Sequence, residues 1–300
     1  MRKFVICFLF IFLFVDNLPN TDLDAMSWPS EDAVLIRNFG VNDRGKPVLG
    51  MVFAGGTSVQ AADRGEVIFT RSKNDTASRL PSPLGAWTAV DHGDGLISIY
   101  SRYADPSDTE FGMYENAASL AHVEKGQHIA YPGISGWSSR DGFNFMIIDR
   151  RERRWVNPAM IITPVPRTRN PQILSVELKN SQGQTVQSRN ISQGRYTVLV
   201  NTISPPVTAS VPGINLVPQR ITCLINGAET ASLTFEAFFA RDGYLMVYRN
   251  GLVPARQIYS AFPSYEASEV FFTRGQVTLE IIVQDIAGNS SGSVMRLSVN

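Results

Sequence analysis

Short apolar runs between turn-forming residues recur along almost the whole chain, and they constrain its fold more than any other feature. Residues 65–69 and 96–100 are two such runs, rich in β-branched and aromatic side chains and preceded closely by glycine or aspartate. This pattern is typical of short, twisted strands. The best helical candidate, residues 115–121, is short enough to be a turn before the next strand. We therefore predict an all-β protein.

A proline-rich stretch marks a boundary near the middle of the chain. Three prolines, at positions 164, 166 and 171, follow the last apolar run of the first half, and proline withholds the backbone donor that a sheet needs. A chain of 300 residues is long enough for two ordinary domains. We predict a first domain over residues 26–163, a linker over 164–170 and a second domain over 171–300.

The first 25 residues have the pattern of a signal peptide. Arg2 and Lys3 precede an apolar run over residues 4–15, which suits an export signal and is too short for an ordinary spanning helix. Retention of the segment as an N-terminal anchor is the alternative. We predict an exported protein, periplasmic or associated with the cell envelope, with no membrane span once residues 1–25 are removed.

Charge and cysteine content narrow the classes of partner and chemistry. Lys and Arg together number 27, as do Asp and Glu, so no global field attracts nucleic acid, and we predict no nucleic-acid partner. Removal of residues 1–25 leaves Cys223 as the only cysteine, so the mature chain forms no internal disulfide. The apolar neighbours of Cys223 predict a buried side chain and not a reactive thiol.

The first half also carries a series of landmarks in a fixed order. They are Trp28-Pro29, Phe39-Gly40, Gly-Thr-Ser-Val-Gln-Ala-Ala-Asp-Arg-Gly-Glu-Val over residues 56–67, His92-Gly93-Asp94-Gly95, Tyr100-Ser101-Arg102-Tyr103, Val-Glu-Lys-Gly-Gln-His-Ile over 123–129, and Gly133-Ile134-Ser135-Gly136. The glycines mark tight turns between strands. In order and spacing, residues 28–162 resemble the LytM/M23 family of zinc peptidases, which cut peptide cross-links in bacterial cell walls. Ser58 stands where the family has proline. The resemblance implies a β domain of the duplicated-hybrid-motif kind.

The resemblance also implies where the zinc site of such a peptidase would lie. The family needs three protein ligands, an open zinc position for water and a histidine that moves protons. With Gly50 setting the register, the first two ligand positions fall on Val48 and Val52. The family's His-x-His falls on Gly142 and Asn144, and its remaining catalytic histidine falls on Arg102. An amide oxygen is a poor zinc ligand, and arginine puts a permanent cation where a dication would sit. We predict no metal, no cofactor and no catalytic residue, so that the protein is not an enzyme.

The three histidines do not form another standard zinc motif. His92 matches a histidine that is frequent in the family, and we predict that it is structural or lines the cleft. His122 and His128 are six positions apart, and we predict that both are surface residues.

Seven candidate strands follow the linker and predict an immunoglobulin-like β-sandwich over residues 171–300. They span residues 172–178, 195–201, 219–225, 232–239, 244–249, 277–285 and 293–299. In the turn from Asp285 to Asn289, we predict that both side chains bond the turn's own backbone, in preference to calcium. Most aromatic residues of this half should be core, whereas residues 256–265 are predicted to be an exposed loop with a possible role as a contact surface.

The resemblance finally implies a function. Family members with emptied sites are similar to activators of cell-wall amidases, in which the degenerate domain docks another protein. We expect the emptied groove to bind a cell-envelope protein, such as a peptidoglycan amidase, with contacts at His92, Arg102 and Asn144. The alternatives are non-catalytic binding of peptidoglycan, a zinc endopeptidase with atypical ligands, and a purely structural spacer.

Overall fold

The structure is a computed structural model of the chain, and it describes residues 25–72, 82–105, 120–163, 169–205, 214 and 216–300. The predicted signal peptide, most of the predicted helix 115–121 and most of the predicted linker therefore lie outside the described residues. Within the described residues, strands dominate, and the helical elements are α1 (Ala255–Tyr259) and the 3-10 turn η2 (Pro158–Met160). The all-β prediction is confirmed. No helix in this part of the chain has the length and apolar character needed to cross a membrane.

The first half is built around β11 (Gly142–Asp149), which pairs along both of its edges. One edge pairs with β8 (Leu96–Tyr103), and the other pairs first with β4 (Met51–Ala54) and then with β12 (Arg154–Val156). The remaining strands of this half are β1 (Val34–Arg37) beside β4, then β7 (Ala86–Asp91), β6 (Gly65–Arg71) and β9 (His122–Val123) beyond β8, and the small pair β5 (Val59–Gln60) and β10 (His128–Ala130). Alternate residues of β11 fill the core beneath the sheet, because Phe143, Phe145 and Ile147 are fully or almost fully buried.

The second half is a sandwich of two sheets. One sheet contains β14 (Thr185–Val186), β13 (Gln172–Asn180), β16 (Gly194–Ile203) and β21 (Tyr265–Phe272). The other contains β15 (Asn190–Ile191), β23 (Ser290–Val299), β22 (Gly275–Gln284), β17 (Arg220–Ile225) and β18 (Ala228–Arg241), with β19 (Tyr244–Arg249) and β20 (Leu252–Pro254) at its side. Each of the seven predicted strands overlaps one of these, whereas β21 and the short strands were not predicted.

The prediction that residues 256–265 form an exposed loop is wrong. This segment contains most of α1 and the first residue of β21, and Ile258, Tyr259 and Tyr265 are buried in the core. Phe262 is its exposed aromatic residue. The apolar side chains at 255, 258 and 259 lie on one face of a single helical turn, a spacing too short to be recognised as helical periodicity.

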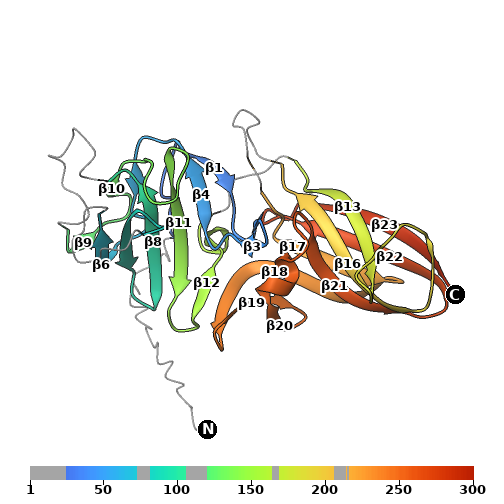
Figure 1. Ribbon diagram of the computed structural model, residues 1–300. Coiled ribbons are helices and arrows are strands. Elements are labelled where there is room, and N and C mark those ends of the chain that lie inside the picture. Colours follow the sequence, from blue (N-terminus) through green and yellow to red (C-terminus); the bar gives the residue numbers. More distant parts are fainter. Residues whose placement is uncertain (1–24, 73–81, 106–119, 164–168, 206–213, 215) are drawn as a thin grey trace, which may run out of the picture.

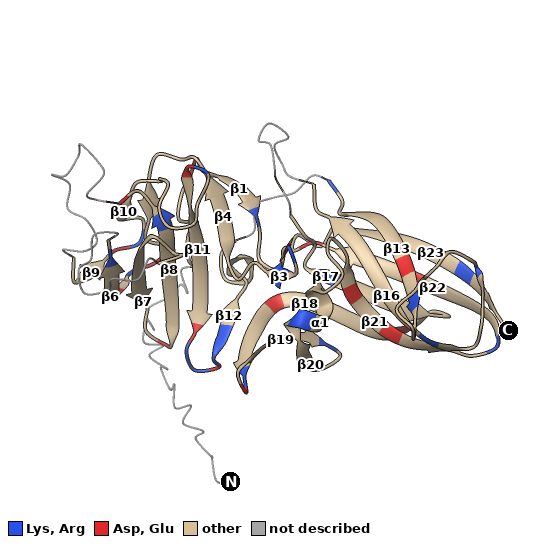
Figure 2. Cartoon of the chain, viewed as in Figure 1, with Lys and Arg blue, Asp and Glu red and all other residues tan. Residues whose placement is uncertain are grey.

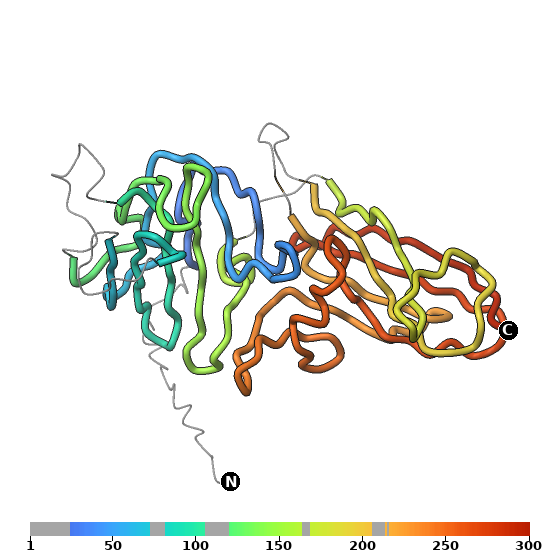
Figure 3. Tube along the Cα trace, in the orientation of Figure 1, coloured from blue at the N-terminus to red at the C-terminus, as the bar shows by residue number. Residues whose placement is uncertain are grey.

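The two halves are joined by a continuous sheet (Figure 1). β12 of the first half pairs antiparallel with β18 of the second, with Trp155 opposite Phe238. The hairpin of β2 (Asn42–Asp43) and β3 (Lys46–Pro47) also lies against the second half, as the blue loop beside the orange segment in Figure 3 shows. Phe39 and Val41, which precede this hairpin, are buried in the hydrophobic core of the second half.

A cationic groove at the predicted zinc position

Three neighbouring strands bring most of the predicted site positions together. Val52 on β4 lies opposite Asn144 on β11, and Asn144 lies opposite Ser101 on β8. Arg102 is the next residue of β8. The residues that the sequence places at separate ligand and catalytic positions therefore lie in one row across the sheet.

An open groove of about 700 Å³ lies beside this row and is lined by both Val52 and Arg102. Its other lining residues are Ile36, Arg37, Asp43, Arg44, Lys46, Trp137, Ser138, Ser139 and Arg140. The lining therefore contains five cationic side chains and one carboxylate, and that carboxylate, on Asp43, is paired with Arg37 at 2.9 Å. The groove is a strongly positive pocket on a chain whose net charge is zero.

A β-bulge sets the position of Arg102. The pairing of β7 with β8 shifts register here, because Trp87 lies opposite Ser101 and Ala86 lies opposite Tyr103. Arg102 has a φ of +64°, a left-handed conformation that costs a non-glycine residue about 1 kcal/mol or more. Its backbone N–H leaves the ladder and donates to Leu84 O at 2.8 Å. Such bulges redirect a side chain, and they recur next to functional sites.

The guanidinium of Arg102 is half-buried and charged. Burial lowers its pKa, and the nearby Arg37 lowers that pKa further while Asp43 raises it. Arginine nevertheless remains protonated in proteins, since its ordinary pKa lies above about 12. The buried Nε of Arg102 has no hydrogen-bond partner among the described residues. A buried donor without a partner costs about 1–3 kcal/mol, a cost that the fold carries at this residue.

Val48, Gly142 and Asn144 do not line the groove, although Asn144 was predicted as one of its contacts. Val48 packs against the core of the second half, and its backbone N–H donates to Val41 O at 2.9 Å. Gly142 is buried, with a φ of +151°, and a Cβ atom there would clash with the backbone carbonyl oxygen of Phe53. The position that the resemblance aligns with a histidine therefore accepts no side chain without a shift of β4.

The residues present do not fit a zinc ion. Val52 offers only hydrocarbon, Arg102 places a cation in the groove, and Val48 lies elsewhere. The oxygens that remain in the row are the Asn144 amide and the Ser101 hydroxyl, and neutral oxygens of this kind are weak zinc ligands. Across the described ranges, no group of three or more His, Cys, Asp or Glu side chains is close enough to hold a metal ion.

The histidines have roles of their own, and none lines the groove. His92 bridges two elements, with Nδ1 2.8 Å from Arg64 O and Nε2 2.7 Å from Ser98 Oγ. His128 is half-buried, and its Nδ1 lies 2.8 Å from Oγ of Ser58, the residue that replaces the family's proline. Burial lowers the pKa of His128. His122 is exposed on β9.

Two tyrosines of the second half hold one wall of the groove. Asp43, Arg44 and Lys46 belong to the β2–β3 hairpin, and this hairpin is anchored through Asn42, whose backbone N–H donates to the Tyr265 hydroxyl at 2.9 Å. The Tyr259 hydroxyl donates to the carbonyl oxygen of residue 40 at 2.6 Å. Sequence reasoning missed this contact because both tyrosines lie in or beside the segment that was predicted to be an exposed loop.

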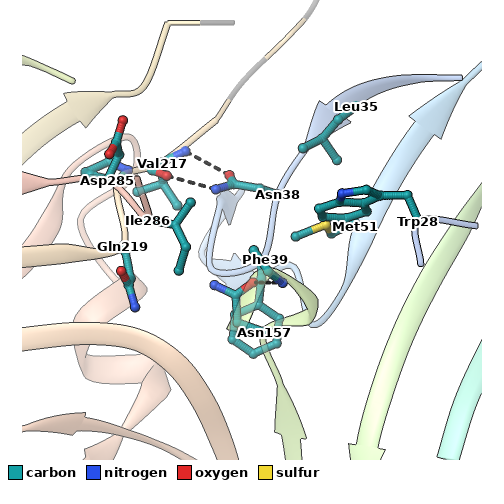
Figure 4. Close-up of a pocket in the computed structure, with 12 residues that line it drawn as sticks. Trp28, Leu35, Asn38, Phe39, Met51, Asn157, Val217, Gln219, Asp285 and Ile286 are labelled. Atoms are coloured by element: carbon teal, nitrogen blue, oxygen red, sulfur yellow. Dashed lines mark hydrogen bonds between the residues drawn. The ribbon is translucent and has the colours of Figure 1, made fainter. Parts of the chain in front are cut away.

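A second contact between the halves surrounds a small cavity (Figure 4). The Asn38 side chain accepts a hydrogen bond from Val217 N and donates one to Val217 O, each at 2.8 Å. The cavity beside it, lined in part by Trp28, Met51 and Ile286, has a volume of about 40 Å³. That is room for a few water molecules at most, so this cavity is not a candidate ligand site.

Comparisons with known proteins give partial likenesses. A protein-family model matches residues 170–300, and no curated protein matches the chain. Among solved structures, the chain is similar to a mutant catalytic domain of the prophage-encoded M23 protein EnpA from Enterococcus faecalis, at 20% identity and a TM-score of 0.34, over 44% of this chain and 94% of that one. It is also similar to the SpoIIQ–SpoIIIAH pore-forming complex, at 18% identity and a TM-score of 0.34, over 46% of this chain and 90% of that one. A zinc-containing peptidase from Vibrio cholerae is similar at 18% identity and a TM-score of 0.35, over 47% of this chain and 41% of that one. At such values, function has to be inferred from the groove itself.

Proposed function

We propose that this chain is a non-catalytic, LytM/M23-like protein of the cell envelope, and that its groove binds a partner protein. The class of partner that the resemblance implies is a cell-wall amidase, whose action on peptidoglycan would be regulated or organised by this binding. The observation that carries the proposal is that an open groove is lined by Val52 and Arg102, the residues that the resemblance aligns with a zinc ligand and a catalytic histidine.

An open groove supports binding more than it supports simple decay. Loss of the zinc chemistry alone places no demand on the cavity, which neighbouring side chains could fill. Here the cavity is open, Trp137 at its lining is 75% exposed, and a strained bulge holds Arg102 inside it. Tryptophan and arginine are the side chains most enriched at the energetic centres of protein interfaces.

The absence of catalysis is tested by metal analysis of the purified protein together with a turnover assay on cross-linked peptidoglycan. We expect less than one zinc ion per chain and no released peptides. One tightly bound zinc ion with peptide release would establish the alternative, an endopeptidase with atypical ligands.

The partner is tested by pull-down of envelope proteins, with a purified cell-wall amidase as the defined candidate, using the wild type and Arg102→Glu. We expect loss of the amidase with the variant. Unchanged recovery of every partner would show that the groove is not the docking site.

The exposed Trp137 also favours a second candidate, binding of peptidoglycan without cleavage, because an aromatic face can stack on a sugar ring. Sedimentation with purified sacculi separates the two functions. A module that docks only proteins stays in the supernatant.

A further inference from the structure

The charge of the groove lining is the feature that a simple loss of zinc ligands does not explain. Replacement of ligands by neutral side chains would leave a neutral cavity, yet the lining carries five cations. The Lys and Arg residues of the lining come from segments far apart in the sequence, and Figure 2 shows two of these segments at the end of β1 and near β3. Their convergence on one pocket creates a local positive potential that attracts an anionic group.

The cationic side chains of the lining also differ in their ion pairs and hydrogen bonds. Arg37 is paired with Asp43, the lone carboxylate of the lining. The buried Nε of Arg102 has no hydrogen-bond partner among the described residues. Arg102 also lines the groove, and a guanidinium binds a carboxylate through two parallel hydrogen bonds, so an incoming carboxylate matches this side chain in both geometry and charge.

We infer that the groove binds an acidic peptide segment of its protein partner, with a carboxylate of that segment at Arg102 and an adjacent apolar side chain against Trp137. This inference rests on the proposed function and adds the chemistry of the ligand. Lys46 and Arg44, on the hairpin that forms one wall, supply further positive charge for neighbouring carboxylates.

A neutral glycan fits the lining less well. Sugar hydroxyl groups both donate and accept hydrogen bonds, and a site for them needs side-chain acceptors as well as donors. The one carboxylate of the lining, on Asp43, is already paired with Arg37. The other side-chain oxygens of the lining that could accept a hydrogen bond are the hydroxyls of Ser138 and Ser139. Five cations beside so few acceptors match a ligand that carries negative charge.

The test measures fluorescence anisotropy of a labelled Glu-rich peptide that also contains one tryptophan, with the same peptide carrying Gln in place of Glu as the neutral probe. We expect the Glu peptide to bind more tightly than the Gln peptide and its binding to weaken as salt is raised. Arg102→Gln and Lys46→Glu should each weaken binding about fivefold, and Arg102→Lys should recover part of the loss.

Arg64→Glu is the matched control, because Arg64 is an exposed arginine of the first half that does not line the groove. It makes a charge reversal comparable to that of Lys46→Glu, and it should change peptide affinity by less than about twofold. Circular dichroism checks that each variant is folded. Lys46 is exposed on a two-strand hairpin, so Lys46→Glu keeps the test decisive even if Arg102→Gln does not fold.

Equal affinity for the Glu and Gln peptides, or equal effects of Lys46→Glu and Arg64→Glu, would overturn the inference. If Arg102→Glu abolishes binding of a purified amidase while the Glu peptide fails to compete, the proposed function stands and the acidic ligand is wrong. If sacculi sediment the wild type but not Arg102→Gln, and the Glu peptide does not compete, the ligand is peptidoglycan and the inference also fails.

Discussion

Gly142 shows how one backbone conformation can exclude a side chain from a position that the resemblance assigns to a catalytic histidine. The residue lies at the start of β11, beside β4, and its φ of +151° is a conformation that side chains other than hydrogen rarely allow. A histidine introduced there would meet the Phe53 carbonyl group before it reached the groove. Restoring the family's residue by single substitution would therefore disturb the sheet and would not rebuild the site.

Replacement of Gly142 by alanine should destabilise the protein by about 3 kcal/mol, since the new Cβ overlaps backbone that cannot move without breaking strand pairing. The measurement is equilibrium unfolding in urea. Gly93→Ala is the control, because Gly93 has a φ of +78° and open space around its Cβ position. It should cost only the conformational strain, about 1 kcal/mol. An equal decrease in the free energy of unfolding for the two variants would contradict the predicted clash.

Cys223 should be unreactive in the folded protein. Its side chain is fully buried, and burial raises the pKa of the thiol to about 12, although Arg249 acts in the opposite direction. Because the thiolate is the reactive form, labelling at pH 8 should be negligible until denaturant is added. Mass spectrometry of the peptide that contains Cys223 gives the extent of labelling. Gln187→Cys, at an exposed position, is the positive control, and equally fast labelling of Cys223 would show that the core opens there.

Residue identities alone carry the prediction that this chain lacks zinc chemistry, because valine binds no metal wherever it lies. They could not predict where each residue would be placed. Val52 and Arg102 line the groove, whereas Val48 packs against the core of the second half, a contact set by tertiary structure. The turn at Asp285 was predictable because its bonds are local, and Asp285 Oδ1 accepts hydrogen bonds from Ala287 N and Asn289 N at 2.9 Å, as expected. The Asn289 side chain donates to Asp285 Oδ2 at 3.0 Å, a side-chain contact that was not predicted.

Among the elements, the β2–β3 hairpin is the one that links the groove to the second half. Tyr265→Phe should loosen it, because the substitution removes the hydroxyl that accepts from the buried Asn42 N–H while keeping the ring in the core. An unsatisfied buried donor costs about 1–2 kcal/mol, which corresponds to roughly tenfold faster hydrogen exchange of the hairpin amides. Hydrogen–deuterium exchange of the hairpin peptide measures this effect.

Tyr196→Phe is the matched control for that exchange experiment. Its hydroxyl donates to Ser192 O at 2.8 Å, a contact within the second half and away from the hairpin. Its loss should leave exchange over residues 39–49 unchanged. Faster exchange in this segment with both variants would mean that the effect is global destabilisation and not release of the hairpin.

Elements with long, alternating apolar patterns were predicted well, and those set by contacts with the other half were not. β22 is an example of the first kind, since its inward positions are apolar and buried at every second residue. α1 and the start of β21 are examples of the second kind. Their prolines and polar residues are typical of a loop, and no local pattern reveals that Tyr259 and Tyr265 pack on Phe235 and form hydrogen bonds with the first half.

At the scale of the whole molecule, the two halves on either side of the predicted linker form a continuous structure. β12 and β18 share hydrogen bonds across the seam, and Phe39 packs against Phe238 with 5.1 Å between ring centroids. Sequence patterns report which residues are apolar and not which core receives them, so they could not reveal that Phe39 and Val41 belong to the core of the second half.

Because the two halves share a sheet and a core, we predict that they unfold together. Differential scanning calorimetry of the wild type should show one transition whose calorimetric and van't Hoff enthalpies agree. Phe39→Ala should leave a cavity where the side chain was fully buried and cost about 3–5 kcal/mol, and because the lost contacts lie between the halves, the single transition should split into two. Phe145→Ala removes an equally buried ring within the first half and should not weaken the seam directly. Two separate transitions in the wild type would mean that the shared sheet and hairpin do not couple the halves, and that the groove wall moves independently of the strands that carry Val52 and Arg102.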